Sequence, residues 1–97
     1  MNTISNKATV AKTAIIHDGV IIEEGVVIHD YVIIYPNTII KKNVEILDHC
    51  VLGKLPTSPG STSRQLKEVY PPLIIDENTI LCPFVSVYTG TKIGKNT

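Results

Sequence analysis

The sequence lacks several features that mark broad classes of protein. It has 9 basic and 9 acidic residues and therefore no formal net charge. A neutral chain of this kind is not expected to have nucleic acid or an anionic membrane surface as its main partner. It has no apolar run of about 18 residues, so no transmembrane helix is expected. Residues 1–7 also lack the apolar core of a signal peptide.

Cysteine and the usual residues of helical bundles are scarce. The 2 cysteines, Cys50 and Cys82, form no CxxC pair and are too few for a disulfide framework. A reducing cytoplasm is therefore the expected location. Alanine occurs 3 times and leucine 6 times, whereas isoleucine occurs 15 times and valine and threonine 10 times each. This excess of β-branched residues favours strands over a helical bundle.

The sequence repeats with a period of six residues. An aliphatic residue returns every six positions from Ile4 to Leu52, and the register resumes from Ile75 to Ile93. Small or β-branched residues follow four positions after most of these. A helix does not repeat every six residues, so each hexad is expected to be a short strand with both series pointing inward. The aliphatic series is Ile4, Val10, Ile16, Ile22, Ile28, Ile34, Ile40, Ile46, Leu52, Ile75, Leu81, Val87 and Ile93.

Turn residues follow the same period. Glycine or asparagine often stands three residues after the aliphatic position, and both tolerate a left-handed backbone. Three strands and three corners then make a coil of 18 residues with a triangular section. The positions are Gly19, Gly25, Asn37, Asn43, Asn78, Gly90 and Asn96.

The repeats resemble those of a known enzyme family. Residues 16–27 (IHDGVIIEEGVV) and 75–80 (IDENTI) are similar to the hexapeptide-repeat acyltransferases, and the likeness covers about 75 of the 97 residues. It implies an all-β fold, a single-stranded left-handed parallel β-helix of about four coils with one long loop inserted at a corner. The left hand comes from the resemblance alone, because the general crossover rule favours the right hand.

The chain is interpreted as one hexapeptide-repeat domain, residues 1–97, incomplete at its C-terminus. The register stops in mid-repeat, so we expect the N-terminal part of a longer enzyme that is inactive by itself. Leu52 and Ile75 are 23 residues apart, which is one hexad plus 17 inserted residues, so Ile75 is expected to stack on Ile40. Residues 54–72 are rich in proline and serine and are expected to form the inserted loop. In this loop Arg64 and Lys67 are candidates for binding a substrate phosphate, and Tyr70 for stacking on a substrate ring.

Two faces of the expected prism carry apolar residues on the outside. Exposed apolar columns on a flat sheet indicate an interface, and the resemblance implies a homotrimer. The alternative is that β-branched residues simply suit strands and remain half exposed. The outward columns are Ile15, Ile33 and Val51 on one face, and Ile21, Ile39 and Ile74 on another.

One corner departs from the glycine and asparagine rule. Thr13, Tyr31, His49 and Phe84 stand at its turn positions. The favoured interpretation is a corner with a different backbone, whose side chains pack against a neighbour. The alternative is strain at a functional site.

The resemblance implies an acyl-CoA-dependent acyltransferase, which transfers an acetyl or other acyl group to an amino or hydroxyl group of a sugar or nucleotide-sugar. Acyl-CoA would be a co-substrate, and no metal is expected. The alternative is a non-catalytic β-helix that serves as a trimerisation or interaction module. Neither the acceptor nor the acyl group follows from the residues.

Acyl transfer needs a general base beside the acceptor. His17 and His49 are the candidate catalytic residues within this chain, followed by His29, but the favoured interpretation is that the base lies outside this chain. His17 is expected to point outward in a column with Tyr35, Gly53 and Tyr88. No histidine is expected to line up with an orienting carboxylate. A zinc site like that of related β-helical carbonic anhydrases is disfavoured, because the three histidines fall at different places around the prism.

Overall fold

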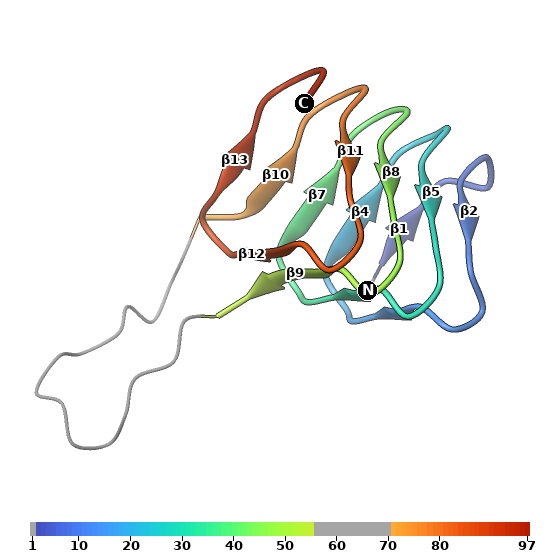
Figure 1. Cartoon of the computed structure of the whole chain (residues 1–97), viewed down its shortest axis with the longest axis horizontal. Coiled ribbons are helices and arrows are strands. Elements are labelled where there is room, and N and C mark those ends of the chain that lie inside the picture. Colours follow the sequence, from blue (N-terminus) through green and yellow to red (C-terminus); the bar gives the residue numbers. More distant parts are fainter. Residues whose placement is uncertain (1, 56–70) are drawn as a thin grey trace, which may run out of the picture.

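The structure, a computed structural model, describes residues 2–55 and 71–97. Within these ranges every regular element is a β-strand of two to four residues, and all strand pairs are parallel. Successive strands wind around a common axis and form three stacked sheets (Figure 1). The prediction of an all-β fold of parallel strands is confirmed, and the arrangement is that of a parallel β-helix.

Each sheet consists of every third strand of the chain, and strands that follow one another in this series are neighbours in the sheet. Sheet A contains β1 (Thr3–Ile4), β4 (Val20–Ile22), β7 (Thr38–Ile40), β10 (Leu73–Ile75) and β13 (Lys92–Ile93). Sheet B contains β2 (Thr9–Val10), β5 (Val27–Ile28), β8 (Glu45–Ile46) and β11 (Ile80–Leu81). Sheet C contains β3 (Ile15–Ile16), β6 (Ile33–Ile34), β9 (Val51–Lys54) and β12 (Ser86–Tyr88).

The strand register confirms the 18-residue coil. Ile4 pairs with Ile22 in sheet A, and Ile16 pairs with Ile34 in sheet C. Across the inserted loop, Ile40 pairs with Ile75, as the sequence count predicted. Equivalent positions of successive repeats therefore lie directly above one another.

The core is the column of aliphatic side chains inside the three sheets. Both predicted inward series are buried in the middle coils, where burial removes apolar surface from water. Thr38 is also fully buried, and its hydroxyl donates to the Tyr35 carbonyl oxygen at 2.9 Å. The insertion adds one core residue that the sequence reasoning missed, Leu73. The buried apolar residues are Val20, Ile22, Val26, Ile28, Val32, Ile34, Ile40, Val44, Ile46, Cys50, Leu52, Leu73, Ile75, Leu81 and Val87.

The corners use left-handed backbone, as predicted from glycine and asparagine. The irregular corner between sheets B and C does the same. Tyr31, His49 and Phe84 have φ angles of 61°, 63° and 64°. The expectation of a different backbone is therefore wrong for these three residues, although Thr13 is not among the positive-φ residues. Non-glycine residues held there cost on the order of 1 kcal/mol each.

The outward apolar columns lie where the sequence predicted them. Ile15, Ile33 and Val51 align on sheet C, and the equivalent isoleucines of β4, β7 and β10 align on sheet A. Ile15 is 54% exposed and Ile21 is 40% exposed. In the two described ranges, the fold includes no helix with the length and apolar character needed to cross a membrane.

Candidate functional site

The two ends of the inserted loop are held together at the end of β12. The backbone N–H of Thr89 donates to the Lys54 carbonyl oxygen at 3.1 Å, and the Thr89 hydroxyl donates to the Pro71 carbonyl oxygen at 3.3 Å. Lys54 is the last residue of β9 before the loop, and its Cα pairs with that of Tyr88. The loop therefore leaves the prism at a fixed place on the edge of sheet C.

A β-bulge at Gly53 sets the position of Lys54. Leu52 pairs with Val87, but Tyr88 pairs with Lys54, so Gly53 is an extra residue. Its φ is +81°, and a Cβ atom at this position would overlap the Thr38 hydroxyl oxygen. Only glycine fits without strain. The expected column with an outward residue 53 is wrong here, because Gly53 is buried and Lys54 takes the outward position.

His17 lies on the outer side of sheet C, as predicted, and is exposed. Its ring stacks on the ring of Tyr35, with centroids 4.8 Å apart and planes 8° from parallel. Among the described residues, no carboxylate lies within ion-pair distance of His17. The structure therefore places this candidate base in an aromatic stack without an orienting acid from residues 2–55 or 71–97.

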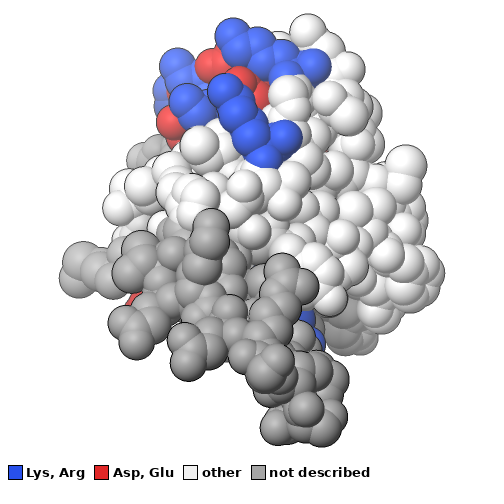
Figure 2. Space-filling view, turned by 90° about the vertical axis from the view of Figure 1, so that its left-hand side faces the viewer, with Lys and Arg blue, Asp and Glu red and all other residues white. Residues whose placement is uncertain are grey.

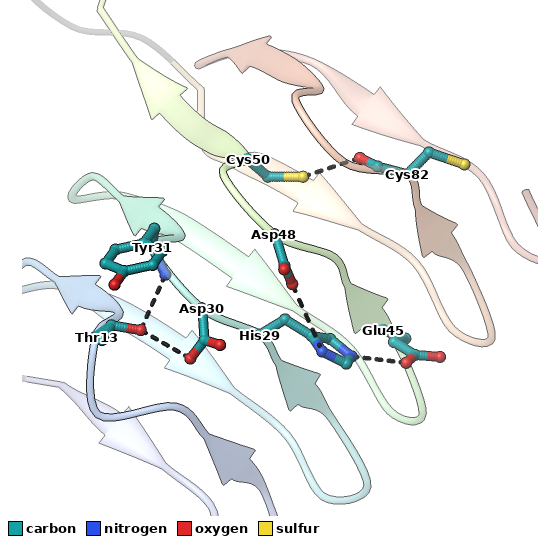
Figure 3. A network of polar contacts seen from close by, with 8 residues as sticks. All are labelled: Thr13, His29, Asp30, Tyr31, Glu45, Asp48, Cys50 and Cys82. Atoms are coloured by element: carbon teal, nitrogen blue, oxygen red, sulfur yellow. Dashed lines mark hydrogen bonds and ion pairs between the residues drawn. The ribbon is translucent and has the colours of Figure 1, made fainter.

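His49 also stacks on aromatic rings. It lies between Tyr31 and Phe84, with centroid distances of 5.1 Å and 5.0 Å. Each such pair contributes about 0.5–1.5 kcal/mol, which is of the same order as the cost of the left-handed backbone at this corner. Below the stack, the Thr13 hydroxyl donates to Asp30 at 2.9 Å and accepts from the Tyr31 backbone N–H at 3.1 Å (Figure 3). Tyr31 and His49 are 18 residues apart, and Phe84 follows His49 by 35 residues because of the insertion, so the sequence signal for the stack was the shared place of the three residues in successive coils.

Among the three histidines, His29 is the one that lies beside carboxylates. Its Nε2 lies 2.8 Å from Glu45 Oε2, and its Nδ1 lies 3.8 Å from Asp48 Oδ1. Figure 3 shows the ring between the two acids, on the outer side of the prism. The ring is about one third exposed, with 36% of the side-chain surface accessible. It is therefore fixed in orientation and open to solvent.

The contact between His29 and Glu45 was not anticipated from the sequence, where the expectation was only that no histidine lines up in a column with a carboxylate. The sequence reasoning considered only residues stacked directly above one another, and Leu47 stands in that position relative to His29. Glu45 precedes Leu47 by two residues and points to the same side of the sheet. Such diagonal neighbours are within reach of long side chains. The signal was present in the register, since Ile28 pairs with Ile46.

The two cysteines differ in environment. Cys50 is fully buried, and its thiol donates to the Cys82 carbonyl oxygen at 3.1 Å. Burial raises the pKa of the Cys50 thiol above its ordinary value, so this group is not an available nucleophile. Cys82 is exposed.

Charged side chains gather at the corner between sheets A and B. The Glu24 carboxylate lies 4.0 Å from Lys7 and 3.7 Å from Lys42, and Lys95 lies 4.0 Å from Glu77. Figure 2 shows basic and acidic groups interleaved along one edge of the molecule. Exposed ion pairs of this kind contribute little to stability.

The loop candidates Arg64, Lys67 and Tyr70 lie outside the described residues. Within residues 2–55 and 71–97 there is no group of three or more histidine, cysteine, aspartate or glutamate side chains arranged to hold a metal ion. Comparison of the chain with protein-family models, with curated proteins and with solved structures gave no match.

Proposed function

We propose that the protein is an acyl-CoA-dependent acyltransferase that acts on an amino or hydroxyl group of a sugar or nucleotide-sugar. The proposal takes the β-helix as left-handed and its assembly as a cytoplasmic homotrimer. It is supported by the similarity of residues 16–27 and 75–80 to hexapeptide-repeat acyltransferases, and by the parallel β-helical arrangement of the strands. The observation that carries the chemistry is the hydrogen bond between His29 and Glu45.

A carboxylate on one ring nitrogen prepares an imidazole to accept a proton on the other. When the Nε2 proton is donated to Glu45, the lone pair lies on Nδ1. Asp48, 3.8 Å from Nδ1, then stabilises the imidazolium that forms. In this proposal His29 is the catalytic base, Glu45 is a positioning residue, and the stacked His17 and His49 are not bases.

The reaction is an exchange of one acyl bond for another. The acceptor amine or hydroxyl attacks the thioester carbonyl carbon, and His29 removes its proton as the new C–N or C–O bond forms. The C–S bond then breaks, and the imidazolium returns the proton to the departing thiolate. The products are the acylated acceptor and free CoA.

The test is the rate of thiol release from acetyl-CoA, with and without a panel of amino-sugar nucleotides, for the full-length protein. Saturable release that depends on the acceptor is expected, and His29→Gln is expected to reduce kcat by about 100-fold or more. Glu45→Gln is expected to reduce it less and to alter its pH profile. His49→Gln is the matched control and should keep the activity. Full activity in His29→Gln would overturn the assignment of the base.

A second function is favoured by the outward apolar columns. A β-helix that exposes Ile15 and Ile21 on two adjoining faces suits a non-catalytic trimerisation or interaction module. Sedimentation and the activity assay together distinguish an acyltransferase from a non-catalytic module. A non-catalytic module would form a trimer but show no acceptor-dependent thiol release. Ile33→Lys is expected to dissociate the assembly in either case, and an unchanged oligomer would exclude sheet C as the contact.

A further inference from the structure

The Asp48 carboxylate faces the second nitrogen of the His29 ring (Figure 3). Its Oδ1 lies 3.8 Å from His29 Nδ1, which is too far for a hydrogen bond between the two atoms. Nε2 lies 2.8 Å from Glu45 Oε2, so the ring proton is assigned to Nε2. Nδ1 and Asp48 Oδ1 are then two hydrogen-bond acceptors with no proton between them.

Both acceptors are accessible to a ligand. The exposed fraction is 36% for the His29 side chain and 50% for the Asp48 side chain. Within residues 2–55 and 71–97, the Asp48 carboxylate accepts no hydrogen bond. The equivalent carboxylate in the preceding coil, that of Asp30, accepts from the Thr13 hydroxyl at 2.9 Å. Asp48 therefore keeps its full capacity to accept hydrogen bonds from a bound substrate, whereas Asp30 does not.

A primary amine matches this pair of acceptors. When its nitrogen lies about 2.9 Å from both atoms, they subtend about 80° at the nitrogen, and each hydrogen bond bends by only about 15°. One N–H donates to Nδ1, the second donates to Oδ1, and the nitrogen lone pair remains free to attack a thioester carbonyl carbon. A hydroxyl group has a single donor. If it donates to Nδ1, its oxygen lone pair faces the Asp48 carboxylate, which repels it.

We propose that Asp48 is the residue that selects a primary amine over a hydroxyl group as the acyl acceptor. The inference rests on the proposed function and narrows its acceptor. When the C–N bond forms, the proton directed at His29 Nδ1 moves onto the ring, the C–S bond of acyl-CoA breaks, and the imidazolium protonates the departing thiolate. The N–H that Asp48 holds stays on the nitrogen and becomes the amide N–H of the product.

The experiment compares three acceptors that differ only at the reacting atom. Thiol release from acetyl-CoA by the full-length protein is measured with the best amino-sugar nucleotide of the panel, with its N-methylamino derivative and with its hydroxyl counterpart. We expect kcat/KM for the primary amine to exceed both others at least about tenfold. The N-methylamino derivative is the control for reactivity, because a secondary amine remains a good nucleophile but has lost one N–H. Equal kcat/KM for the primary and secondary amines would overturn the inference.

Variants test the assignment to Asp48. Asp48→Ala is expected to reduce the preference for the primary over the secondary amine to less than about threefold, whatever its effect on the overall rate. Asp30→Ala is the matched control, because it removes the same charge from the same column and should keep the preference at about tenfold or more. Circular dichroism checks that both variants are folded. An undiminished preference in Asp48→Ala, or an equal reduction in Asp30→Ala, would overturn the inference.

The two proposals fail separately. Acyl transfer to hydroxyl or secondary-amine acceptors as efficiently as to primary amines would retain the proposed function and refute the role of Asp48. If no acceptor is acylated, the proposed function fails, and proton NMR of the His29 ring signals during titration with glucosamine tests the amine contact alone. Shifts that glucose does not cause and that Asp48→Ala abolishes would retain this contact. Absence of such shifts would refute both proposals.

Discussion

Replacement of Ile34 by alanine tests the inward assignment of the six-residue series. Ile34 is fully buried in β6, between Ile16 of β3 and Leu52 of β9. The short β-helix cannot easily collapse around the lost side chain, so we expect a loss of about 2–5 kcal/mol of unfolding free energy. For a domain of this size, each kcal/mol lowers Tm by about 4–8 °C. The expected decrease in Tm is therefore at least about 8 °C.

Ile33 provides the matched control because it is the adjacent residue of the same strand. Its side chain points outward and is only partly buried. We expect Ile33→Ala to cost no more than about 1 kcal/mol in the monomer, and any further loss to depend on protein concentration, as for an interface residue. Urea unfolding followed by far-UV circular dichroism at two protein concentrations measures both effects. Equal, concentration-independent losses for Ile33→Ala and Ile34→Ala would refute the inward and outward assignment.

Three further predictions concern single positions. Gly53→Ala should destabilise the fold by more than about 1 kcal/mol in thermal unfolding, because alanine is strained at positive φ and its Cβ would overlap Thr38. Gly94→Ala is the control, because no atom lies within 4 Å of an added Cβ there. It should change stability by less than about 0.5 kcal/mol. Iodoacetamide at about pH 8 should modify Cys82 and spare Cys50, since burial raises the Cys50 pKa; mass spectrometry that found Cys50 labelled in the native protein would contradict its burial. Because the Cys50 pKa is higher in the folded protein than in the unfolded chain, Cys50 makes its full contribution to stability below the ordinary thiol pKa. This contribution declines as the pH rises toward the raised pKa of the folded protein. Glu24→Gln should leave the unfolding free energy within about 0.5 kcal/mol of the original, because its ion pairs are exposed.

The period of six carried most of the fold information. It determined which residues point inward, the 18-residue stacking and the pairing of Ile40 with Ile75 across the insertion. It did not locate the first inserted residue, because a count of residues fixes the length of an insertion and not its start. The bulge at Gly53 depends on the contact with Thr38 in another strand, which no local pattern encodes.

The site was less predictable than the fold. The pairing of His29 with Glu45 follows from a diagonal contact between neighbouring strands, which becomes visible only when side-chain reach is added to the register. The left-handed backbone at His49 runs against residue preference, and the stacking of three rings offsets its cost. In both cases the decisive interaction lies between coils and not within a repeat.

Identification of the product tests the proposed function most directly. The full-length protein is incubated with acetyl-CoA and a candidate amino-sugar nucleotide, and the acceptor is analysed by mass spectrometry and NMR. The account predicts that an acetyl group becomes attached to an amino or hydroxyl group of the sugar, in an amount equal to the CoA released. Unmodified acceptors across the panel, with acetyl-CoA intact or merely hydrolysed, would contradict it.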